Sequence, residues 1–146
     1  MRAFGQNHRT IELGPDLGSV LVLDQTRLPD AFEKIALRTV SEAADAIRGM
    51  VVRGAPLIGV TAAFGVWLAL RDDPGDAALD AAVRLLGATR PTAVNLAWAL
   101  GRVRRELGSV APPDRGKEAL VLAMRMADED AAACHAIGFH GSELLR

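Results

Sequence analysis

The sequence has few of the residues that mark particular protein classes. It contains one cysteine, Cys134, no tyrosine, and only 4% aromatic residues. A single cysteine excludes an intrachain disulfide and is typical of the reducing cytoplasm, where we expect this protein to be. The scarcity of aromatic residues argues against an all-β sandwich and favours helices.

Neither sign of charge dominates, and no apolar run is long enough for a membrane span. The 17 Lys and Arg against 18 Asp and Glu argue against nucleic-acid binding through bulk positive charge. The longest apolar run, from Ala55 to Leu70, is shorter than the roughly 20 residues that cross a bilayer, and it contains Pro56, Gly59 and Gly65. We therefore expect no nucleic-acid or membrane partner, and we expect this run to form a buried core helix.

Half of the 146 residues are hydrophobic, which is enough for one folded domain or one domain and part of a second. Short apolar runs between turn residues predict strands at 10–13, 20–23 and 32–37, the last of which also tolerates a helix. Thr39 and Glu42 form a capping-box pattern, which predicts a helix that ends near Gly49. Helical periodicity predicts further helices at 56–70, 77–86, 93–107 and, after a loop at 108–114, 115–146. The predicted class is α+β, a small β-strand segment followed by a helical bundle.

Two segments place an arginine just before a helix that is predicted to begin at a proline. They are Arg53-Gly54-Ala55-Pro56 and Arg90-Pro91-Thr92. The N-terminus of a helix offers unpaired N–H groups and a positive dipole to an anion, and arginine adds a fork of donors that suits phosphate. Gly54 lets the backbone approach a ligand closely. The pattern indicates a phosphate site, although either arginine can instead pair with a carboxylate.

The other candidate residues favour structural roles. His135 and His140 are five apart, which is not the i, i+4 spacing of a helical zinc site. Cys134, Trp67 and Trp98 are predicted to be core residues because they lie in apolar helices. We expect neither a metal nor an organic cofactor.

Four segments, in order and spacing, resemble the methylthioribose-1-phosphate isomerase family. They are Leu23-Asp24-Gln25 with Leu28-Pro29, Met50 to Val60, Arg90 to Leu96, and Ala136-Ile137-Gly138 with His140-Gly141. The wider family includes ribose-1,5-bisphosphate isomerase and the regulatory alpha, beta and delta subunits of translation initiation factor 2B. The two arginine-bearing segments are most similar to the methylthioribose branch.

The resemblance implies the N-terminal domain of a two-domain isomerase whose Rossmann-like domain is absent here. It divides the chain into a β-strand segment at 1–38, a helical domain with phosphate-binding turns at 39–112, and a long helix at 113–146 that leads towards the missing C-terminal domain. It implies that Arg53, Gly54, Ala55 and Arg90 contact the sugar phosphate. The family's catalytic cysteine, in a Thr-His-Cys-Asn segment, and its catalytic aspartate have no counterpart here. We therefore expect no catalytic residue in this chain.

The implied reaction converts 5-methylthioribose 1-phosphate to 5-methylthioribulose 1-phosphate in methionine salvage. This chain would bind the phosphate of the pentose substrate, would be inactive alone, and would belong to a homo-oligomer. One alternative is a non-catalytic regulatory or interaction module related to the initiation factor 2B subunits. Another is a self-sufficient helical interaction domain.

Overall fold

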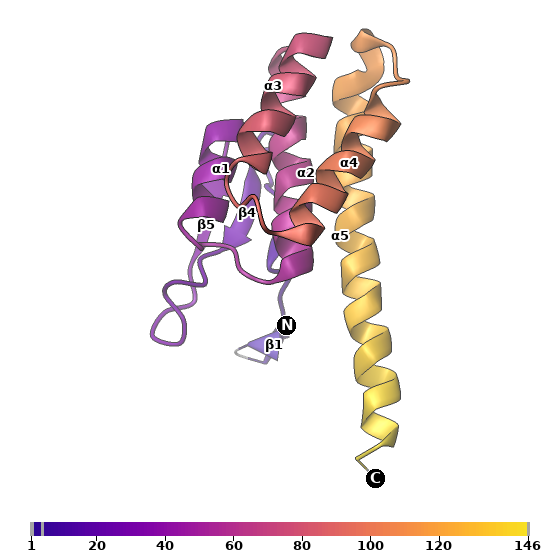
Figure 1. The fold of residues 1–146 in the computed structure, drawn as a ribbon. Coiled ribbons are helices and arrows are strands. Elements are labelled where there is room, and N and C mark those ends of the chain that lie inside the picture. Colours follow the sequence, from indigo (N-terminus) through magenta and orange to yellow (C-terminus); the bar gives the residue numbers. More distant parts are fainter. Residues whose placement is uncertain (1, 4, 146) are drawn as a thin grey trace.

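The computed structural model describes residues 2–3 and 5–145, and it has an N-terminal set of short strands followed by helices (Figure 1). The strands are β1 (Arg2–Ala3), β2 (Gln6–Asn7), β3 (Ile11–Leu13), β4 (Val20–Leu23) and β5 (Lys34–Leu37). The helices are α1 (Val40–Arg48), α2 (Ala55–Asp72), α3 (Asp76–Gly87), α4 (Val94–Leu107) and α5 (Pro112–Glu143). This order confirms the predicted α+β class, and the segment at 32–37 contributes a strand.

Strands β3, β4 and β5 form an antiparallel sheet in that order, while β1 pairs with β2. Val20 in the central strand lies opposite Leu13 on one side and Leu37 on the other. Val20 and Val22, two residues apart on one face of the sheet, are completely buried in the same core as the helices. The sheet therefore covers one side of the helical layer.

Helix α1 begins and ends at the residues that the sequence predicted. The Thr39 hydroxyl accepts a hydrogen bond from the Glu42 backbone N–H at 3.1 Å, and the Glu42 carboxylate accepts one from the backbone N–H of Arg38. The second bond reaches one residue further back than in the standard capping box. Gly49 caps the C-terminal end.

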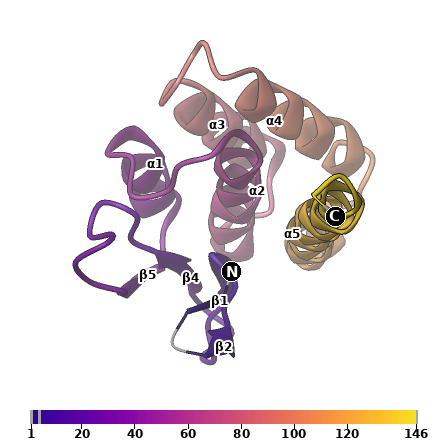
Figure 2. The same ribbon diagram turned by 90° about the horizontal axis from the view of Figure 1, so that it is seen from below.

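Helix α2 lies at the centre of the protein, surrounded by α1, α3, α4 and α5 (Figure 2). This position explains why α2 is apolar on every face, because each face packs against another element. Gly65 allows α1 and α3 to pack closely, since a Cβ there would lie 3.0 Å from that of Ala43 and 3.1 Å from a methyl group of Leu86. By length and composition α2 would pass as a membrane span, but 72% of it is buried inside this fold.

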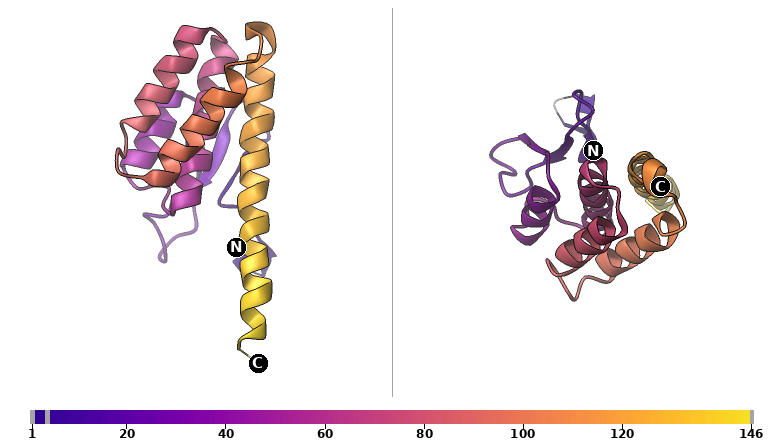
Figure 3. Two further views of the ribbon diagram at one scale, coloured as in Figure 1. Left: turned by 45° about the vertical axis from the view of Figure 1, so that its right-hand side comes forward. Right: turned by 90° about the horizontal axis from the view of Figure 1, so that it is seen from above.

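Helix α5 runs along the bundle and continues beyond it (Figure 3). It begins at Pro112, so the prediction of a loop up to Asp114 was wrong. Proline is compatible with the first turn of a helix, where its missing N–H has no partner to lose. Residues 131–140 are exposed, and the buried residues of α5 all lie in its first half, up to Ala127.

Candidate functional site

The N-termini of α2 and α4 lie side by side at the same end of the helical layer (Figure 1). Between them is a hollow of about 360 Å³, which we call the helix-terminus hollow. Its lining residues are Gly54, Ala55, Ile58, Arg90, Ala93, Val94 and Asn95. In the described chain neither helix has a side-chain cap, so both positive helix ends are available to an anion.

Gly54 precedes α2 in a backbone conformation that favours glycine. Its φ is +100° and its ψ is 130°, and no described atom lies within 4 Å of the position that a Cβ would occupy. Glycine is therefore required here by the backbone angle and not by crowding. The open space beside Gly54 belongs to the hollow.

Gly54→Ala is expected to lower the free energy of unfolding by about 1–2 kcal/mol, because alanine strongly disfavours this φ. Gly101→Ala is the matched control. Gly101 is an exposed position inside α4, and no described atom lies within 4 Å of the point where its Cβ would be. Alanine at Gly101 is expected to raise the free energy of unfolding by up to about 1 kcal/mol. Urea unfolding of the two variants measures both effects, and equal changes of the same sign would contradict the conformational explanation.

Arg90 reaches the hollow from a turn that precedes α4. The backbone N–H of Ala93 donates to the Arg90 carbonyl at 3.0 Å, which closes a turn with Pro91 at its second position. The expectation that a proline starts this helix was therefore wrong, whereas the predicted bounds of 93–107 agree with α4 to within one residue. Among the described residues, the half-buried Arg90 guanidinium has neither a hydrogen bond nor a salt bridge.

Arg53 lies beside the hollow but is engaged elsewhere. Its guanidinium donates to the Gln25 carbonyl at 2.9 Å, and the Gln25 side-chain amide donates to the Arg53 carbonyl at 3.3 Å. The residues lining the hollow thus include Gly54, Ala55 and Arg90 but not Arg53. The structure brings three of the four sequence-predicted residues together.

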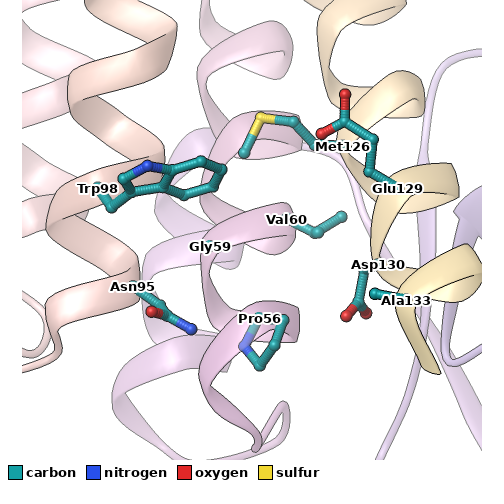
Figure 4. Close-up of a pocket in the computed structure, with 9 residues that line it drawn as sticks. All are labelled: Pro56, Gly59, Val60, Asn95, Trp98, Met126, Glu129, Asp130 and Ala133. Carbon is teal, nitrogen blue, oxygen red and sulfur yellow. The ribbon is translucent and has the colours of Figure 1, made fainter. Parts of the chain in front are cut away.

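A second cavity of about 370 Å³, which we call the apolar cleft, lies between α2, α4 and α5 (Figure 4). Its lining residues are Pro56, Gly59, Val60, Asn95, Trp98, Met126, Glu129, Asp130 and Ala133. Asn95 lines both cavities. The floor is tight, because a Cβ on Gly59 would lie 2.9 Å from that of Ala99.

An ionic network holds Trp98 at the edge of the cleft. The Arg102 guanidinium lies 5.8 Å from the Trp98 ring centroid, and it donates to Glu106 at 2.8 Å and to both carboxylate oxygens of Glu129. These hydrogen bonds from Arg102 lower the pKa of Glu129, and those to Glu129 and Glu106 raise the pKa of Arg102. Arg102 is therefore a fixed cation that supports the indole.

Two residues predicted to be in the core are on the surface. Trp98 is 58% exposed and Cys134 is exposed, whereas Trp67 is buried as predicted. The sequence contained a signal for Trp98, because Leu96, Leu100 and Val103 form the buried stripe of α4 and Trp98 falls on the opposite side. No cluster of three or more potential metal ligands occurs among the described residues.

Residues 51–146, which carry both cavities, match the model of the initiation factor 2 subunit family. This chain belongs to that family. Curated relatives in it include methylthioribose-1-phosphate isomerases from Methylobacterium nodulans, 54% identical over 99% of this chain, and from Methylocella silvestris, 53% identical over all of it. The chain spans about 40% of the length of each of these relatives.

Two solved structures of family members share the fold. A 5-methylthioribose 1-phosphate isomerase from Pyrococcus horikoshii OT3 matches 92% of this chain with a TM-score of 0.83 and 35% identity. The delta subunit of translation initiation factor eIF-2B from A. fulgidus matches 86% of it with a TM-score of 0.76 and 33% identity. The chain covers 40% and 38% of those two chains.

Proposed function

We propose that this chain is the phosphate-binding, N-terminal part of an aldose–ketose isomerase that converts 5-methylthioribose 1-phosphate to 5-methylthioribulose 1-phosphate. The observation that carries the proposal is the helix-terminus hollow, in a chain about half identical to isomerases of that name. Two helix N-termini converge there with the Arg90 guanidinium, which has no partner among the described residues. All three favour a dianionic phosphate.

In the proposed reaction this chain binds and orients the sugar without reacting with it. The N–H groups at the starts of α2 and α4 and the Arg90 guanidinium hold the phosphate, and Gly54 and Ala55 form the wall beside it. Arg53 joins them if its guanidinium leaves the Gln25 carbonyl. Fixing one end of the substrate places the carbons that exchange hydrogen at a constant position. General acid–base groups elsewhere in the longer protein complete the reaction.

The proposal keeps the three-segment division of the chain, with the boundaries 1–38, 39–112 and 113–146. It assigns the outer part of α5 to contacts with the remainder of the longer protein and with a second copy in a homo-oligomer. The exposed apolar residues at this end are Ile137 and Phe139 in α5 and Leu144 and Leu145 after it. Exposed apolar surface of this kind is typical of an interaction site.

A non-catalytic regulatory module is the second candidate, and the similarity to the eIF-2B delta subunit supports it. The two candidates differ in their ligand. The isomerase proposal requires recognition of a pentose phosphate by the hollow, whereas a regulatory module requires only a protein partner.

Calorimetric titration of the 146-residue chain with methylthioribulose 1-phosphate tests the isomerase proposal. We expect saturable binding that is stronger than that of inorganic phosphate, and no conversion of methylthioribose 1-phosphate by the chain alone. Absence of sugar phosphate binding would contradict the proposed site. Turnover by the pure chain would contradict the division of labour between this part and the rest of the protein.

A further inference from the structure

The apolar cleft adjoins the helix-terminus hollow along α2. The hollow is lined by Ala55 and Ile58, and the cleft by the residues that follow each of them, Pro56 and Gly59. Because one turn of an α-helix rises about 5.4 Å, both cavities lie along the same first turns of α2. Asn95, at the start of α4, lines both. The two cavities are therefore neighbouring parts of one surface.

The chemistry changes in a fixed order across this surface. Arg90 and the helix N-termini make the hollow electropositive. Next come Asn95 and Asp130, which lie on opposite sides of Pro56 in Figure 4 and offer amide and carboxylate groups. At the far end are the Trp98 ring and the Met126 side chain, beside the Glu129 carboxylate, which is paired with Arg102 (Figure 4). The order is cationic, then hydrogen-bonding, then apolar.

We propose that the apolar cleft is the subsite for the methylthio end of the substrate, with Trp98 and Met126 as its specificity-determining residues. This inference rests on the proposed function. The substrate carries a phosphate on C1, hydroxyls on C2 and C3 and a thioether on C5, which is the same order of groups. Thioether sulfur packs favourably against aromatic rings and apolar side chains. The Asn95 amide and the Asp130 carboxylate suit the sugar hydroxyls between the two ends.

The two side chains proposed to contact the thioether are already held in position in the absence of a ligand. Met126 is only 4% exposed, so its position is fixed by packing, while the 58% exposed Trp98 ring is held by Arg102. Arg102 is in turn held by Glu106 and Glu129. A fixed aromatic wall loses little conformational entropy when it contacts a ligand. A volume of about 370 Å³ also lies in the range of small-molecule sites.

The test compares methylthioribulose 1-phosphate with ribulose 1-phosphate, which lacks the thioether, by calorimetric titration of the chain. We expect the wild-type chain to prefer the methylthio compound by about tenfold, the usual effect of a small apolar group in a fitted pocket. Trp98→Ala should remove most of this preference and leave ribulose 1-phosphate affinity within about twofold. Val121→Ala, another exposed apolar residue but outside the cleft lining, should retain the preference.

NMR of the indole N–H groups adds a readout of position. The methylthio compound should shift the Trp98 resonance and leave that of the buried Trp67 unchanged. Equal binding of the two sugar phosphates by both wild type and Trp98→Ala would overturn the subsite inference but not the proposed function. 5-Methylthioribose, which has no phosphate, is the third compound. If it bound as tightly as methylthioribulose 1-phosphate and lost this binding in Trp98→Ala, the result would support the subsite and overturn the phosphate assignment. Failure of all three compounds to bind would overturn both.

Discussion

Replacing Arg90 by alanine is expected to weaken binding of methylthioribulose 1-phosphate by about 10- to 100-fold. A charge-assisted hydrogen bond from arginine contributes about 1.5–3 kcal/mol, and each 1.4 kcal/mol is about a factor of ten in affinity. The effect should fall on binding alone, because the guanidinium has no hydrogen-bonding partner among the described residues whose loss would destabilise the fold. Calorimetry measures the affinity, and urea unfolding checks the stability.

Arg53→Ala is the informative comparison for Arg90→Ala. Arg53 must give up its 2.9 Å hydrogen bond to the Gln25 carbonyl before it can reach the hollow, so the net contribution to binding is smaller. We expect a loss of about fivefold or less. Arg90→Lys should fall between wild type and Arg90→Ala, because lysine keeps the charge but not the planar fork. Unchanged affinity in Arg90→Ala, together with abolished binding in Arg53→Ala, would move the phosphate anchor to Arg53.

Arg115→Ala is expected to have the largest effect on stability, a loss of about 3–5 kcal/mol, because it removes a buried side chain together with its hydrogen bonds to three backbone carbonyls. The Arg115 side chain is 3% exposed, and its guanidinium donates to the carbonyls of Leu107, Pro74 and Val110 at 3.2, 2.8 and 3.0 Å. It therefore links the end of α4, the turn before α3 and the start of α5. Alanine would remove the guanidinium donor from these three carbonyls, of which the Leu107 carbonyl would keep the Val110 N–H, and would create a cavity.

Asp76→Ala separates the carbonyl contacts of Arg115 from its salt bridge. Asp76 lies 2.8 Å from the Arg115 guanidinium, but its side chain is 85% exposed. An ion pair with such an exposed partner contributes about 1 kcal/mol or less, so the loss should be small. Urea midpoints of the two variants provide the comparison, with unchanged m-values as the check that both unfold from a native-like state. Similar losses in Arg115→Ala and Asp76→Ala would contradict the central role of the carbonyls.

Features that depend on neighbouring residues could be predicted from the sequence. The start of α1 follows from the hydroxyl of Thr39 and the position of Glu42. The burial of α2 follows from its composition, because a helix without a polar face is stable only when it is covered on all sides. The family was identified from short motifs whose residues are also local.

Other features depended on side chains brought together from distant parts of the chain. Pro91 looked like a helix start, but the Ala93 N–H closes a turn on the Arg90 carbonyl and α4 begins later. The periodicity of α4 already places Trp98 opposite the buried stripe, but the hydrogen bonds that hold Arg102 to Glu129 in α5 required the packing of the two helices to be known. No local pattern links these residues.

The sequence by itself determined the α+β class, the central apolar helix and the family, because capping, periodicity and motifs are encoded within a few residues of one another. Tertiary structure alone decided that Arg90 faces the hollow while Arg53 turns to Gln25, and that an apolar cleft adjoins the hollow. The physical reason is that the direction of a long side chain, and the space between helices, depend on packing partners that are remote in sequence.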